Sequence, residues 1–96
     1  MVYERVHIQI KPGEEEPFEA AMKESGLALL GCGDGCHSVV LARGVENPES
    51  YLLLLQWDEV DAHMEFTRTP EFAQFRELAG PFFADAPAME HFLPVN

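Results

Sequence analysis

Apolar and polar residues alternate along residues 2–10 of the chain, VYERVHIQI. In an extended chain Val6, Ile8 and Ile10 point to one side and Arg5 and His7 point to the other. This alternation is typical of a strand with one buried face.

Similar patterns predict three more strands and the helices between them. The strands are expected at residues 37–43, 51–57 and 88–95, and the helices near 14–26, 59–67 and 70–79, with Asp58 and Thr69 as N-caps. The order β-α-β-β-α-(α)-β predicts an α+β fold, a ferredoxin-like βαββαβ sandwich with an antiparallel sheet. With 96 residues and no internal repeat or linker, residues 1–96 are expected to form a single domain.

The third predicted strand, YLLLLQW at residues 51–57, is apolar on both faces. A strand with one solvated face should alternate, so both faces of this strand should be covered. Helices of a ferredoxin-like fold cover only one of them. A second copy of the sheet is the simplest cover and predicts a homodimer. The alternative is that Phe82 and Phe83 fold over the second face within one chain.

Charge narrows the choice of partners. Seventeen acidic residues against six basic ones give a net charge of −11, which repels nucleic acid and anionic membranes. No apolar run is long enough to span a bilayer, and the start of the chain lacks the basic and apolar pattern of a signal peptide. We therefore expect a cytoplasmic protein with reduced thiols, no nucleic-acid partner and no membrane partner.

The segment GCGDGCHS, residues 31–38, holds both cysteines of the chain. Three residues separate the cysteines, whereas c-type haem attachment requires two, and no second Cys/His pair supplies a zinc site. Cys36 and His37 point to opposite faces if they begin a strand. The segment is therefore predicted to be a glycine turn with a buried Cys36, an exposed Cys32 and no metal.

An ordered set of short motifs resembles the antibiotic biosynthesis monooxygenase family of dimeric α+β barrels. The motifs are Lys11-Pro12-Gly13, Gly35-Cys36, Glu46-Asn47-Pro48, the strand-end Trp57, Ala62-His63 and Thr69-Pro70-Glu71-Phe72. The resemblance implies a homodimer with sheets packed face to face and a pocket between sheet and helices. It also implies oxidation of phenolic, anthrone-like or quinol substrates by O2 without metal or flavin. Phe66 departs from the family pattern, since many members carry a histidine there.

The resemblance and the residue chemistry together select the candidate site. His63 and Arg76 are the candidate catalytic residues, as base and anion stabiliser. The candidate substrate pocket contains Trp57, Phe66, His7 and Phe72. Four of these residues have a simpler alternative: Trp57 in the core, His63 solvated, Arg76 in a surface ion pair, and His7 in the dimer interface.

Two functions remain open from the sequence. One is a cofactor-independent monooxygenase acting on a small phenolic, anthrone-like or quinol substrate. The other is a non-catalytic dimeric protein of the same fold that binds a small aromatic or apolar ligand.

Overall fold

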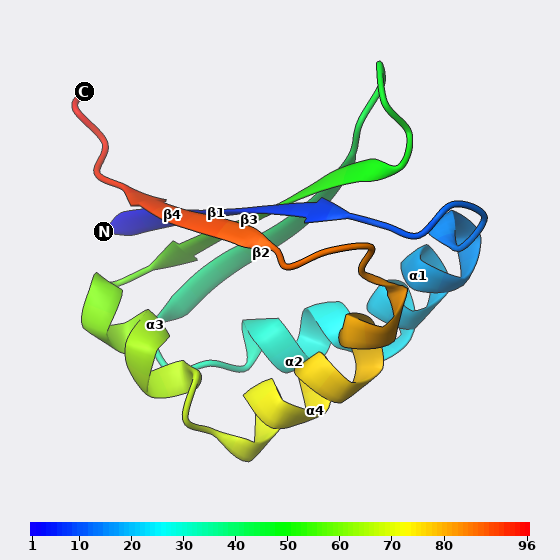
Figure 1. Cartoon of the computed structure of the whole chain (residues 1–96). Coiled ribbons are helices and arrows are strands. Elements are labelled where there is room, and N and C mark those ends of the chain that lie inside the picture. The colour runs from blue at the N-terminus through cyan, green and yellow to red at the C-terminus, as the bar shows by residue number, and fades with distance from the viewer.

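Four antiparallel strands form one sheet in the order β2-β3-β1-β4 in a computed structural model that describes residues 1–96. The strands are β1 (Val2–Gln9), β2 (Cys36–Arg43), β3 (Ser50–Trp57) and β4 (Ala88–Phe92). The two central strands are β1 and β3, and β4 forms one edge (Figure 1). The four predicted strands are confirmed, although β4 ends at Phe92 rather than at residue 95.

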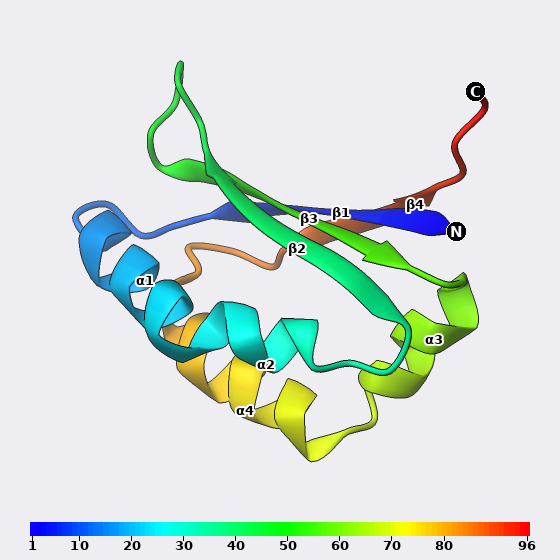
Figure 2. The same cartoon turned by 180° about the vertical axis from the view of Figure 1, so that it is seen from behind.

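All helices lie on one side of the sheet, and α2 and α4 run side by side beneath it (Figures 1 and 2). The helical elements are α1 (Glu15–Ala21), the π-helical turn η1 (Met22–Gly26), α2 (Leu27–Gly31), α3 (Val60–Phe66), α4 (Pro70–Ala79) and the 3₁₀ turn η2 (Gly80–Phe82). The fold is therefore the predicted ferredoxin-like α+β sandwich. None of these helices is both long and apolar enough to cross a membrane.

The N-cap residue was predicted correctly for α4 but not for α3. The Thr69 side chain accepts a hydrogen bond from the backbone N–H of Phe72, and Pro70 occupies the first turn, as predicted. The prediction of Asp58 as the N-cap of α3 was wrong, since Glu59 holds that position without a side-chain bond. The Asp58 carboxylate instead contacts the imidazole of His37 across the ends of β2 and β3.

The two faces of the sheet differ sharply in burial. On the inner face Leu53 and Leu55 are buried, whereas on the outer face Leu54 is 40% exposed and Val40 is 51% exposed. Phe82 and Phe83 pack against Phe18 on the helical side, so they do not cover the outer face. A single chain thus leaves its apolar outer face uncovered.

The glycine-rich turn before β2 lies against the wall of the core. A Cβ on Gly33 would lie 2.9 Å from ring atoms of both Phe66 and Trp57, and Gly35 has a φ of +85°. Glycine is required at both positions, by close approach and by left-handed backbone respectively. Cys32 is exposed and Cys36 is half-buried rather than fully buried; both thiols are free.

Candidate active site

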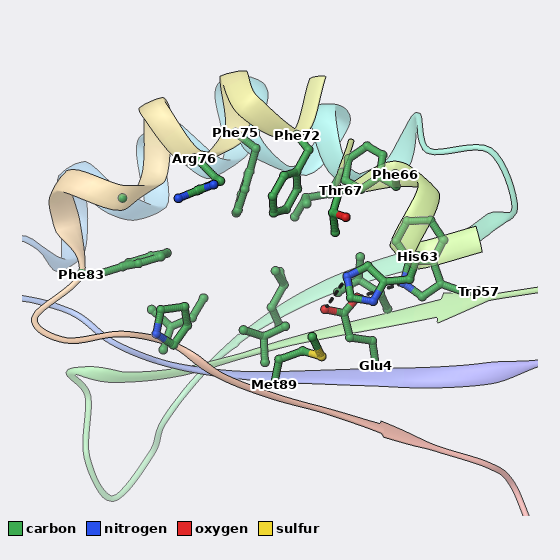
Figure 3. A pocket seen from close by; sticks show the side chains of 17 residues that line it. Glu4, Trp57, His63, Phe66, Thr67, Phe72, Phe75, Arg76, Phe83 and Met89 are labelled. Carbon is green, nitrogen blue, oxygen red and sulfur yellow. Dashed lines mark hydrogen bonds and ion pairs between the residues drawn. The ribbon is translucent and has the colours of Figure 1, made fainter. Parts of the chain in front are cut away.

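A cavity of about 470 Å³ lies between the inner face of the sheet and helices α3 and α4 (Figure 3). Its walls are predominantly apolar. They are formed by Glu4, Val6, Ile8, Leu30, Leu53, Leu55, Trp57, His63, Phe66, Thr67, Phe72, Phe75, Arg76, Gly80, Phe83, Pro87 and Met89. A largely apolar concavity with a few polar groups is typical of a small-molecule site.

One end of the cavity is closed and the other is open. Glu4 and His63 are buried, whereas Arg76 and Met89, which line the same cavity, are exposed. The mouth therefore lies between α4 and the segment that leads into β4. A ligand entering there would place its leading end against Glu4 and His63.

Glu4 is a carboxylate on the apolar face of β1, only 5% exposed. Its Oε1 accepts a hydrogen bond of 2.9 Å from Nε1 of Trp57, and its Oε2 lies 3.3 Å from Nε2 of His63. Burial raises the pKa of Glu4 above its usual 4.5, and the bond from Trp57 offsets part of that rise. A carboxyl group with a raised pKa in a cleft is suited to proton transfer.

His63 is held on three sides. Its ring stacks on that of Trp57, with centroids 5.3 Å apart, and its Nδ1 lies 2.7 Å from Nε2 of His91. Burial, together with the neighbouring His91, lowers the pKa of His63 to about 4. His63 is therefore neutral at pH 7, and its 3.3 Å contact with Glu4 is one between a neutral imidazole and a carboxyl group.

Most of the predicted pocket residues come together in this cavity. Trp57, His63, Phe66, Phe72 and Arg76 all line it. Phe66 and Phe72 meet edge to face, 5.6 Å between ring centroids, and so form one aromatic wall. The alternative of a solvated His63 is excluded by its burial, and Arg76 makes no ion pair with an acidic side chain.

His7 does not line this cavity, contrary to the prediction. It lies on the outer face of the sheet, where its Nε2 is 2.6 Å from Oγ of Ser50. The reason is the alternation of β1: Glu4, Val6 and Ile8 point inward, so His7 points outward. The alternative of an outer-face position, where a second sheet would pack, is the one that agrees with the structure.

The site predicted from the sequence did not include Glu4 or His91, although His91 was expected near an edge or the interface and does lie on the edge strand β4. Glu4 shares its side of β1 with Val2 and Val6, so an acid among buried apolar positions was a readable signal. His91 faces inward because β4 pairs with β1 in a register that places it opposite Glu4. That register depends on the turn and loop before β4, which the local sequence pattern does not fix.

The sequence of this chain matches a known protein family. The sequence profile of the antibiotic biosynthesis monooxygenase family matches residues 1–78, and the chain belongs to that family. It is 33% identical over 97 residues to the uncharacterised protein YczJ of Bacillus subtilis strain 168, spanning 99% of this chain and all of YczJ.

Solved structures agree with that assignment. A protein from Bordetella bronchiseptica that carries the same family name superposes with a TM-score of 0.93 at 35% identity, over 99% of this chain and 97% of the other. A variant of SnoaB, a cofactor-independent oxygenase from Streptomyces nogalater, has the same fold, with a TM-score of 0.83 at 17% identity over 99% and 93% of the two chains.

Proposed function

We propose that this protein is a cofactor-independent monooxygenase that oxidises a small phenolic, anthrone-like or quinol substrate with O2. The observation that carries the proposal is the buried carboxyl–imidazole pair of Glu4 and His63, 3.3 Å apart at the closed end of an apolar cavity. A base in a dry, apolar site is what deprotonation of a weakly acidic phenol or enol requires.

The electrons come from the substrate. Loss of a proton to the Glu4–His63 pair leaves an electron-rich anion, which transfers an electron to O2 and then forms a C–O bond with it. For a methylene of the anthrone type, the carbon loses both hydrogens and becomes a carbonyl that carries one atom of O2. The other oxygen atom leaves with those two hydrogens as water, so no external reductant is needed.

Arg76 lies at the mouth rather than beside the base. Its guanidinium lies 6.0 Å from the centroid of the Phe72 ring. A cation stacked near an aromatic wall would attract a ligand that is flat and carries an oxyanion or carboxylate at its outer end. We therefore assign Arg76 to substrate selection at the entrance and the Glu4–His63 pair to proton transfer.

A homodimer is part of the proposal. The outer face of the sheet exposes Tyr3, Val40, Leu54 and Phe92, each by 40% or more. Burial of such an apolar face against the same face of a second copy would remove it from water and keep both cavities on the outside of the pair. Light scattering that gives the mass of one chain, 10.8 kDa, across dilution would contradict this part.

Oxygen uptake tests the function. The purified protein is assayed with a panel of hydroquinones, anthrones and naphthols, before and after dialysis against a chelator. We expect at least one substrate to consume O2 above the uncatalysed rate, to the same extent after dialysis. Binding of these compounds without any uptake would support the non-catalytic binding function, which the same apolar cavity favours.

A further inference from the structure

Both ring nitrogens of His63 face a polar side chain. Nε2 lies 3.3 Å from Oε2 of Glu4, and Nδ1 lies 2.7 Å from Nε2 of His91. A neutral imidazole has one N–H and one lone pair, so His63 has no free position for a substrate proton. Glu4 lines the cavity, and each of its oxygens has two lone pairs but at most one partner within the chain.

The far end of the row Glu4–His63–His91 reaches the surface. His91 lies on the edge strand β4, directly across from Glu4 on the inner face. The Nδ1 atom of His91 has no hydrogen bond within the chain. If it were buried it would be a buried polar atom without a partner, and the only such side-chain atom is Nε of Arg5. The Nδ1 atom of His91 is therefore accessible to solvent.

We propose that Glu4 is the group that accepts the substrate proton, and that His63 and His91 form a proton path between Glu4 and solvent at the sheet edge. The role of this path in catalysis rests on the proposed function. The path itself is a property of three side chains and can be tested without substrate.

The row has two proton arrangements. When Glu4 is ionised, Nε2–H of His91 donates to Nδ1 of His63, and Nε2 of His63 carries its N–H toward Oε2 of Glu4, 3.3 Å away. When a proton binds Nδ1 of His91, the proton on Nε2 of His91 moves to Nδ1 of His63. The proton on Nε2 of His63 then moves to Glu4. Glu4 then carries an O–H that donates to Nε2 of His63, while Nδ1–H of His63 donates to His91. One proton has entered and one O–H has formed, and both imidazoles end neutral.

The path gives the closed end of the cavity a second connection to water. A bound ligand would block the mouth beside Arg76, and Glu4 could still lose or gain a proton through His91. The titratable groups that face His63 are Glu4 from β1 and His91 from β4. From β2, Cys36 is near enough to Glu4 for the carboxylate to contribute to the raised pKa of its thiol.

Nitrogen NMR of the imidazoles tests the path in the full chain without ligand, because it distinguishes N–H, lone-pair and charged ring nitrogens. Infrared absorption of the carboxyl group follows Glu4 over the same pH range. As Glu4 gains its proton, the N–H of His63 should move from Nε2 to Nδ1 without a charged intermediate population. Glu4→Gln should abolish this switch, and the exposed surface variant His37→Gln should retain it. The path is overturned if His63 keeps its N–H on one nitrogen, or becomes charged, while Glu4 gains the proton.

Oxygen uptake then separates the path from the function. We expect His91→Ala to lower kcat by roughly 10-fold or more with KM little changed, and added imidazole to restore part of the rate. If the parent protein consumes no O2, the proposed function fails and the NMR switch alone decides the path. If the parent is active and His91→Ala is equally active, the path is wrong.

Discussion

The indole N–H of Trp57 donates a 2.9 Å hydrogen bond to the Glu4 carboxylate, joining the end of β3 to the proposed base on β1. Trp57 is fully buried and also lines the cavity, so it is a core residue and a site residue at once. Its ring supports His63 from one side while its N–H holds one oxygen of Glu4. The orientation of the base thus depends on the packing of the core.

Replacing Trp57 by Phe should raise the pKa of Glu4 further. The bond from Trp57 lowers that pKa against the larger effect of burial, and Phe keeps an aromatic ring but removes the donor. The pH at which the Glu4 carboxyl band changes in the infrared spectrum should move upward. The acid limb of the pH–rate profile should move with it. An unchanged pH for both would show that the bond does not tune Glu4.

His63 should make the free energy of unfolding fall on acidification. Its native pKa is about 4, against 6.5 for the free side chain, so between these pH values the unfolded chain binds a proton that the native chain does not. Native stability from this residue is therefore complete above pH 6.5 and declines as pH falls to 4. The slope is at most about 1.4 kcal/mol per pH unit.

The matched measurement compares the parent with His63→Gln by denaturant unfolding at neutral and mildly acidic pH. Glu4 acts in the opposite sense, because its raised native pKa makes the native chain bind more protons above pH 4.5. The difference between parent and variant isolates His63. The parent should lose more stability than His63→Gln on acidification, and equal losses would contradict the account.

Leu53→Glu and Leu54→Glu should have opposite consequences, although the two positions are adjacent. Leu53 is 3% exposed in the core, so a charge there should prevent folding. Leu54 is 40% exposed on the outer face, so a charge there should leave the fold intact and separate the dimer. Circular dichroism and light scattering check the pair. If the Leu54→Glu variant is folded and still dimeric, the second copy of the chain does not pack on the outer face of the sheet.

Arg76→Ala should weaken the binding of anionic substrates more than that of neutral ones of the same shape. An exposed charge pair contributes about 1 kcal/mol or less, so we expect KM for the anionic substrate to rise up to about 5-fold with kcat nearly unchanged. Arg68→Ala is the matched control, because Arg68 is paired with Glu65 and does not line the cavity. Equal effects on KM for anionic and neutral substrates would show that Arg76 does not select for anionic substrates.

The sequence predicted the fold well because alternation and capping are local. The two-sided strand at 51–57 correctly indicated an apolar outer face, and Thr69-Pro70 marked the start of α4. The site was predicted less completely, because its polar row joins β1, α3 and β4. His63 could be selected from its chemistry, whereas His91 needed the β1–β4 register, which only the folded chain supplies.

Turnover under isotopically labelled O2 tests whether the protein is an oxygenase that uses Glu4 as its base. A substrate found active in the uptake panel is turned over under labelled gas by chelator-treated protein, and by Glu4→Gln with His37→Gln as the matched control. We expect one labelled oxygen atom in the product and one in water, with His37→Gln as active as the parent and Glu4→Gln slower by about 10²-fold or more. Product oxygen that comes from water would rule out the monooxygenase reaction, and full activity in Glu4→Gln would rule out Glu4 as its base.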